Sequence, residues 1–313
     1  PDFEQRIHTL AGRLARTRLS TFWISVDSAV AEVHEAMRGL PGVVRGMARA
    51  LPIFHQYELY PSANLGINRN TGGLPAEIPE DAEGCRLFFL QAFERFYQGV
   101  EALGFTIVNA CYPMSGEPDQ GAYRAASSDD VVRFSPAQRA AVYRALFETI
   151  PRFRHRLRIF SPRSSLHALI RQHEGEANAG YPCPGGRDFF FVDARRGDTF
   201  PCGYRGEDNL GKFWQLDTSR QDGAECRRCD WECFRDPAEM IGPLQDFLRR
   251  PWRVAQKCLR EREALGLWLE DLRYYRACEF FNGRRPLDTA RLARFCRDIP
   301  EAGDRGAAVA ARV

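Results

Sequence analysis

The sequence lacks long apolar segments and a strong excess of either charge. No run approaches the roughly 18 consecutive apolar residues that a membrane-spanning helix needs. The 44 basic and 41 acidic side chains leave a net charge of +3, which gives no drive toward nucleic acid or a membrane surface. We therefore expect neither as a partner. The chain begins at Pro1 without a charged-then-apolar leader, and we expect a cytoplasmic location.

Several common catalytic motifs are also missing. The sequence contains no GxxxxGK phosphate loop, no HExxH zinc helix and no GxSxG nucleophile turn, and its six histidines are dispersed. The apolar share of 44% and the charged share of 27% are those of an ordinary globular chain. At 313 residues, the chain is long enough for about two domains and a sizeable core.

Strand and helix patterns alternate over the first 175 residues. Short apolar runs that suit buried parallel strands lie at 21–26, 63–67, 105–110 and 157–160. Helical spacing of apolar residues covers 3–14, 29–37, 43–57 and 86–103, and Ser135-Pro136 has the N-cap and first-turn proline of a further helix. Because strands that alternate with helices of this length form parallel βαβ units, we expect an α/β layer or part of a barrel.

The composition changes abruptly near Gly180. From there to about Asp236 the chain is rich in Cys, Gly and Arg, and the segments 188–193 and 198–201 around Gly197 predict a β-hairpin. After Asp236 the pattern is helical again. The expected organisation is a first domain over 1–175, a cysteine-rich domain over 176–240, helices over 241–300 and a flexible tail over 301–313.

Five of the ten cysteines lie between Cys183 and Cys233. Cys183 and Cys202 flank the predicted hairpin, and Cys226 and Cys229 form a CxxC. A hairpin and a CxxC turn can bring four thiolates around one metal centre, either zinc or a [4Fe–4S] cluster, and the spacing alone does not decide between them. Cys233 is a fifth candidate for the four positions. The remaining cysteines stand singly in helical or strand-like segments, where we expect them to pack as small hydrophobic residues: Cys85, Cys111, Cys258, Cys278 and Cys296.

This cysteine pattern resembles the auxiliary-cluster (SPASM or twitch) domain of radical S-adenosylmethionine enzymes. The resemblance rests on Cys183, the hairpin Gly197, Cys202 and the CxxC. Cys233 follows the CxxC sooner than the next cysteine of a full SPASM domain does, so the resemblance implies one auxiliary cluster, as in twitch domains. The implied metal ligands are Cys183, Cys202, Cys226 and Cys229, with Cys233 as the alternate.

The first half of the chain resembles the barrel of the same family. Residues 24–28 with Arg38 look like the fourth strand and the following helix, and residues 63–70 and 106–112 are similar to the fifth and sixth strands. In that family the strand serine and the downstream arginine approach S-adenosylmethionine, which implies Ser25 and Arg38 here.

Four further polar side chains sit at the C-terminal ends of these predicted strands, where barrel enzymes place groups that face the substrate. Of these we expect Asn68 and Asn109 to contact the cofactor, although each of the four is equally well explained as a turn-forming or strand-capping residue. The four are Asp27, Asn68, Arg69 and Asn109.

The resemblance implies the C-terminal portion of a partial (β/α)6 TIM-like barrel, a small Cys-rich β-hairpin domain and C-terminal helices. It also implies [4Fe–4S] clusters and S-adenosylmethionine as cofactors, a small-molecule or peptide substrate, and an electron-donor protein. The family's CxxxCxxC motif does not occur in the sequence. We expect it upstream of Pro1, so this chain alone should not perform the radical step. The alternative is a non-catalytic module with a four-cysteine zinc site and an α/β domain that binds a ligand or partner.

Overall fold

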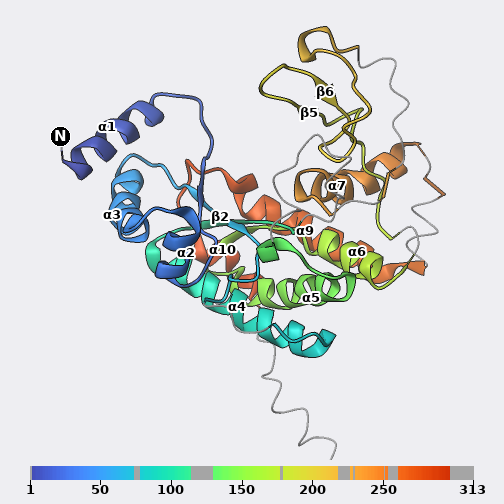
Figure 1. Ribbon diagram of the computed structural model, residues 1–313, viewed down its shortest axis with the longest axis horizontal. Coiled ribbons are helices and arrows are strands. Elements are labelled where there is room, and N and C mark those ends of the chain that lie inside the picture. Colours follow the sequence, from blue (N-terminus) through green and yellow to red (C-terminus); the bar gives the residue numbers. More distant parts are fainter. Residues whose placement is uncertain are drawn as a thin grey trace, which may run out of the picture.

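The computed structural model describes residues 2–73, 78–113, 130–176, 179–217, 226–227, 230–249, 251–252 and 260–296. At its centre is a four-stranded parallel sheet in the order β1-β2-β3-β4, with helices between successive strands (Figure 1). The protein is therefore α/β, as the alternating pattern predicts. Each strand lies beside the next one along the chain, so the order lacks the reversal of a doubly wound sheet. The strands are β1 (Trp23–Ser25), β2 (Ser62–Gly66), β3 (Ile107–Cys111) and β4 (Arg158–Phe160).

The helices near the sheet follow their local sequence signals. At the start of α5 the Ser135 hydroxyl accepts from the Gln138 amide while the Gln138 side chain accepts from the Ser135 amide, which completes a capping box. α4 begins at Ala82 rather than Arg86 because the Asp81 side chain caps it. The helices are α1 (Phe3–Ala15), α2 (Ala31–Arg38), α3 (Val43–Gln56), α4 (Ala82–Leu103), the short η1 (Asp130–Val132), α5 (Pro136–Phe153) and α6 (Arg163–His173).

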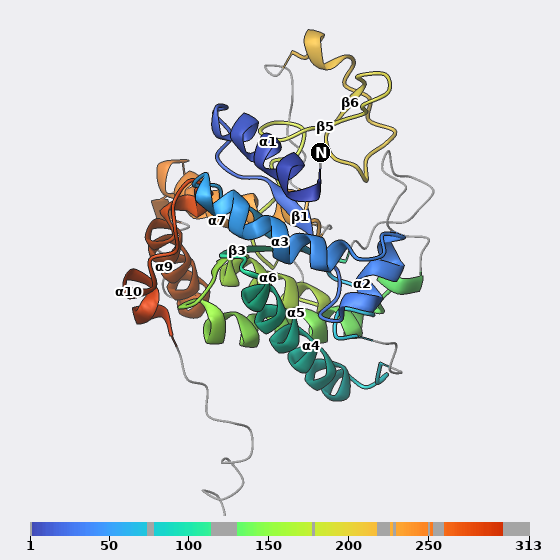
Figure 2. The same ribbon diagram turned by 90° about the vertical axis from the view of Figure 1, so that its left-hand side faces the viewer.

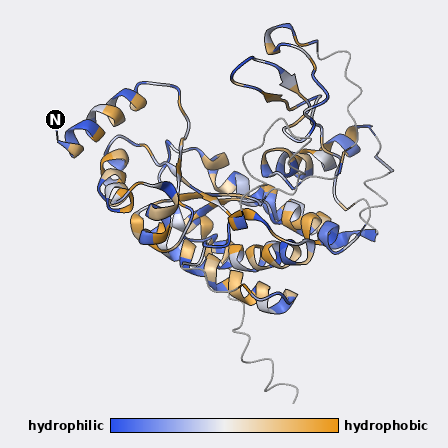
Figure 3. Ribbon diagram, in the orientation of Figure 1, coloured by the Kyte–Doolittle hydropathy of each residue, from blue (hydrophilic) through white to orange (hydrophobic). Residues whose placement is uncertain are grey.

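One face of the sheet packs against these helices. Successive strand side chains point to opposite faces, and Ala63, Leu65, Val108, Ala110 and Ile159 lie in the main hydrophobic core. Figure 3 shows the hydrophobic colour along the strands and on many positions of the helices below them. The aromatic and aliphatic residues that α4 and α5 contribute to this core include Phe89, Phe93, Phe96, Tyr97, Leu146 and Ile150.

C-terminal helices cover the amino end of the other face. Ile107 packs in a second cluster with Tyr274 and Phe281, and an Arg158 guanidinium N–H donates to the Asn282 carbonyl at 3.0 Å. Phe160, at the carboxyl end of β4, also packs against Tyr275 and Phe281. The carboxyl ends of β1, β2 and β3 are therefore the part of this face left for a functional site. The covering elements are α9 (Arg262–Ala277), η4 (Glu279–Phe281), α10 (Thr289–Leu292) and η5 (Ala293–Phe295).

The cysteine-rich segment forms a separate lobe that Figures 1 and 2 show on the opposite side of the sheet from α4 and α5. It contains the expected hairpin, in which β5 (Phe191–Val192) pairs antiparallel with β6 (Thr199–Phe200), followed by the short η2 (Phe213–Gln215). Helix α7 (Glu232–Arg249) begins before Asp236, where the helical pattern was expected to resume, and runs across residue 240. Cys258 and residues 301–313 lie outside the described residues. No helix in the described ranges is long and apolar enough to cross a membrane.

A buried ion pair anchors α9 to α5 and α6. A guanidinium N–H of the fully buried Arg154 donates to Asp271 Oδ1 at 2.7 Å. The second oxygen of Asp271 accepts from the Ser164 amide at 2.8 Å and from its hydroxyl at 2.9 Å. Because a buried charge is tolerated only when it is paired and hydrogen-bonded, this network depends on each member.

We predict that Asp271→Asn lowers the free energy of unfolding by about 3–5 kcal/mol, since it leaves the Arg154 charge buried without its counter-charge. The neighbouring Glu270→Gln is the matched control. Glu270 lies 3.4 Å from the same guanidinium and 3.5 Å from Arg163, but it keeps 20% of its side chain exposed, and Asp271 still neutralises Arg154 in this variant, so its loss should be smaller, about 1–2 kcal/mol. Urea unfolding measures the free energy of unfolding of both variants. Equal losses would contradict the role of Asp271 as the main counter-charge of Arg154.

Candidate metal centre and cofactor face

Three of the predicted metal ligands come together at the hairpin. The Cys183 amide donates to the Cys226 carbonyl at 2.7 Å, which joins the segment before the hairpin to the CxxC segment. Cys183 and Cys202 are 9% and 8% exposed and pack with Phe234, and Cys226 packs against the same cluster. We call Cys183, Cys202 and Cys226 the cysteine cluster.

Glycine allows this close packing. A Cβ at Gly185 would lie 2.9 Å from the Pro201 carbonyl oxygen and 3.3 Å from Cys183 Sγ, so a side chain there would push the two segments apart. The Gly185 amide donates to Cys183 Sγ at 3.3 Å. Amide hydrogen bonds of this kind orient cysteine ligands and tune the metals they hold. The surrounding shell is aromatic and includes Phe189, Tyr204, Trp231 and Phe234.

Of the other two candidate ligands, the structure describes Cys233 but not Cys229. Cys229 lies outside the described residues. Cys233 is an exposed residue in the first turn of α7, where its Sγ is 3.5 Å from Glu232 Oε1. Within the described ranges, which omit Cys229, no group of three or more His, Cys, Asp and Glu side chains is arranged to hold a metal ion. Cys183, Cys202 and Cys226 are all among the described residues, so these three pack in one cluster without being arranged around a metal ion.

Asp230 fixes the end of the CxxC segment to the helical layer. Its side chain is fully buried, and its Oδ2 accepts from the Tyr143 hydroxyl of α5 at 3.1 Å and lies 3.5 Å from His173 Nε2 of α6. The residue that follows Cys229 is thus held by two helices of the main core.

Helix α7 contacts the carboxyl end of β3 through two buried acids. Glu232 accepts from the Tyr112 amide at 3.2 Å, and Asp236 accepts from the Tyr112 and Ser165 hydroxyls at 3.3 and 2.5 Å. Burial raises the pKa of Glu232 and raises that of Asp236 well above its ordinary value. Burial, together with the nearby Glu232 carboxylate, also raises the pKa of the Cys233 thiol to about 12.

The polar face of the sheet holds two of the predicted cofactor residues in one row. Ser25, Asn64 and Asn109 are register partners across β1, β2 and β3. An Asn109 amide N–H donates to Asn64 Oδ1 at 2.8 Å, and the Cys111 thiol lies 3.5 Å from the same oxygen. Cys111, expected only to pack, is thus part of this polar row, and burial raises the pKa of its thiol. Asn64 was not predicted as a site residue, although it alternates in β2 with the core residues Ala63 and Leu65 and must therefore lie on the other face.

Arg38, the last residue of α2, and Asn68, in the loop after β2, lie beside this row. Arg38 Nε donates to Asp27 Oδ2 at 2.5 Å, and 42% of the Arg38 side chain stays exposed. Asn68 is 2% exposed, and its amide donates to the carbonyls of Asp27 and Gly66 at 2.8 and 2.7 Å. Arg38 is therefore accessible to an anion, whereas Asn68 braces the loop after β2. Arg69 donates to the Arg133 carbonyl and lies over the Phe134 ring.

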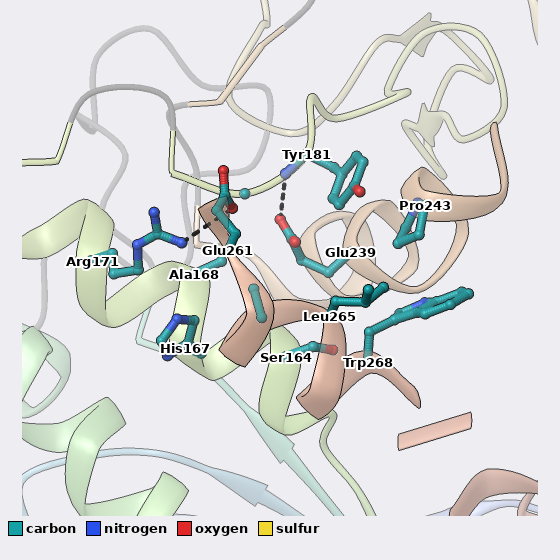
Figure 4. Close-up of a pocket in the computed structure, with 12 residues that line it drawn as sticks. Ser164, His167, Ala168, Arg171, Tyr181, Glu239, Pro243, Glu261, Leu265 and Trp268 are labelled. Atoms are coloured by element: carbon teal, nitrogen blue, oxygen red, sulfur yellow. Dashed lines mark hydrogen bonds and ion pairs between the residues drawn. The ribbon is translucent and has the colours of Figure 1, made fainter. Parts of the chain in front are cut away.

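A pocket lies between α6, α7 and α9, beside the cysteine-rich lobe (Figure 4). Arg171 pairs with Glu261 at 3.4 Å, and the Glu239 carboxylate accepts from the Tyr181 amide at 2.7 Å. Its cavity of about 40 Å³ is far smaller than the 300–1,000 Å³ of ordinary ligand pockets. We therefore interpret these contacts as packing contacts that hold the cysteine-rich lobe against the helices, rather than as the functional site.

We predict that Gly197→Ala destabilises the hairpin more than Gly211→Ala does. Both glycines have a positive φ, +70° and +93°, so each alanine costs about 1–2 kcal/mol in backbone strain. A Cβ at Gly197 would also lie 2.5 Å from the Trp214 ring, whereas one at Gly211 meets nothing within 4 Å. Urea unfolding should show a further loss of about 1–3 kcal/mol for Gly197→Ala alone. Equal losses would show that the ring is not packed there.

We predict that Asp236 makes the protein less stable as the pH rises. Because its pKa is higher in the folded state, the folded protein holds a proton that the unfolded chain has lost, and the free energy of unfolding falls above about pH 4. Asp236→Asn keeps the shape and removes this titration. Unfolding at about pH 5 and about pH 8 should show a smaller fall for the variant than for the parent chain. Identical falls would mean that Asp236 stays ionised in the fold.

No protein-family model matches the chain, and no curated protein or solved structure matches it either. The resemblance to radical S-adenosylmethionine enzymes therefore rests on the cysteine spacing and the strand motifs alone. The function has to be argued from the cysteine cluster and the polar face of the sheet.

Proposed function

We propose that the chain is the C-terminal part of a radical S-adenosylmethionine enzyme, with an auxiliary [4Fe–4S] cluster on Cys183, Cys202, Cys226 and Cys229. The observation that carries the proposal is that Cys183, Cys202 and Cys226, from three separate segments, pack in one cluster beside the hairpin, on the side of the sheet opposite α4 and α5. The N–H···S contact at Cys183 favours a thiolate ligand there. Cys233, which lies beside Glu232, remains the alternate ligand.

The sheet supports the barrel part of the proposal. Four parallel strands in chain order, with one face on the helices and the other carrying Ser25, Asn64 and Asn109, have the arrangement of successive strands in a β/α barrel. β1 and β4 are edge strands in the described sheet. The proposal assigns further strands to a longer chain that also carries the CxxxCxxC motif.

The residues on the polar face take defined roles in this proposal. Arg38 binds the carboxylate of S-adenosylmethionine, with Asp27 holding its guanidinium in place. Ser25 on β1 and Asn109 on β3 contribute hydrogen bonds from either side of β2, and Asn68 keeps the loop after β2 in position. In the family, bound S-adenosylmethionine and a reduced cluster supply hydrogen-abstraction chemistry. A small-molecule or peptide substrate would lie over this face, and an electron-donor protein would supply the reducing equivalents.

The competing function is a non-catalytic module with structural zinc at the same cysteines. Four cysteine ligands suit zinc as well as iron–sulfur clusters. Ser25 and Asn64, which are partly exposed beside the buried Asn109, favour the enzyme, because a purely structural module has no need for aligned polar side chains on one face of its sheet.

We predict that the protein, purified without oxygen and reconstituted with iron and sulfide, binds about four iron and four sulfide per chain. Cys202→Ala should lose most of this iron because it removes a ligand from the cysteine cluster. Cys85→Ala is the control, since Cys85 is fully buried in the main core, apart from the cluster.

The measurement is iron, sulfide and zinc content with the visible absorption spectrum. Stoichiometric zinc, with no iron and no brown colour after reconstitution, would overturn the cluster assignment. Full iron content in Cys202→Ala would remove that residue from the ligand set.

A further inference from the structure

A concave surface on the C-terminal helices carries an excess of arginine. Arg163, Arg273, Arg276, Arg291 and Arg294 line a hollow of about 930 Å³ between α5, α6, α9 and the α10 region. We call it the arginine concavity. Among the described residues, two carboxylates, Glu263 and Glu270, line it with them. Figure 2 shows α9 and α10 at the side of the molecule, away from β5 and β6, so this surface is separate from the cysteine cluster.

The positive charges are only partly balanced within the protein. Glu270 lies 3.4 Å from Arg154 and 3.5 Å from Arg163, and Arg291 pairs with Glu279 at 3.2 Å. In the described part of the chain, by contrast, no ion pair involves the three remaining arginines of the concavity, which are Arg273, Arg276 and Arg294.

Packing holds several of these side chains in place. The Arg294 guanidinium lies 4.9 Å from the centre of the Phe295 ring, and that of Arg163 lies 3.9 Å from the centre of Phe147. An Arg291 N–H donates to the Arg276 carbonyl at 2.9 Å, which ties α10 to the last turn of α9. Guanidinium groups held in this way lose little side-chain entropy when an anion binds.

We propose that the arginine concavity binds a small ligand that carries two or more linked phosphate groups. Arg273 and Arg276 are one turn apart on α9, and Arg294 faces the same hollow from the α10 region, so a single tetrahedral anion would leave donors unused. Guanidinium forks match phosphate oxygens in pairs, and the hollow falls within the range of small-ligand sites. The net charge of +3 for the whole chain argues against nucleic acid as the ligand.

The test is calorimetric titration of the full chain with pyrophosphate at fixed ionic strength. The triple variant R273A/R276A/R294A should weaken binding at least about tenfold, because three charge-assisted contacts are lost. The matched control is R6A/R13A/R16A on α1, which removes the same charge from three exposed arginines that make no ion pair within the described residues. It should bind within about twofold of the parent chain if the effect is local.

Two further ligands identify what the concavity recognises. Citrate has a comparable negative charge but no phosphate, and it should bind at least about tenfold more weakly than pyrophosphate. ATP should bind at least as tightly as pyrophosphate, which would extend the site to nucleotides. If the nucleoside clashes with the hollow, ATP binds more weakly than pyrophosphate, and the site is restricted to free polyphosphates. No pyrophosphate binding, equal binding by the R273A/R276A/R294A variant, or equal binding of citrate would overturn the proposal. Circular dichroism of each variant verifies that it is folded.

Discussion

The arrangement of the proposed site depends on how α7 meets the carboxyl end of β3. Glu232 and Asp236 are buried and accept hydrogen bonds from Tyr112 and Ser165. Burial of their carboxyl groups would cost free energy without these bonds. The same helix begins immediately after the CxxC segment. Asp230, bound by Tyr143, adds a second fixed point. The cysteine-rich lobe is therefore held at the end of the sheet where polar strand side chains gather.

One face of the sheet packs in the main hydrophobic core, and the other face carries the polar side chains of the proposed site. Ala63, Leu65 and Val108 bury one face against α4 and α5, so the fold does not need the other face for its main core. That leaves Ser25 and Asn64 partly exposed at the opposite face beside the buried Asn109, while the C-terminal helices cover its amino end and the end of β4. A site between the polar row and the lobe follows from this division.

The strands, the start of α5 and the hairpin could be predicted from the sequence because they depend on local residue patterns. Apolar runs marked the four strands, Ser135-Pro136 marked the start of α5, and Gly197 marked the hairpin turn. What could not be predicted depends on contacts between distant segments. The packing of Cys183 with Cys226, the pairing of Arg38 with Asp27 and the bond from the Asn68 amide to the Asp27 carbonyl become visible only in the folded chain. Helix α6 was missed because its few apolar positions are interrupted by polar residues that turn out to be buried.

The most direct test of the account is X-ray absorption spectroscopy at the iron and zinc edges on anaerobically reconstituted protein. The account predicts iron with sulfur neighbours at about 2.3 Å and short iron–iron distances, as in a [4Fe–4S] cluster, with both features lost in Cys226→Ala. Zinc bound by four sulfurs at about 2.3 Å, with no iron signal, would contradict it.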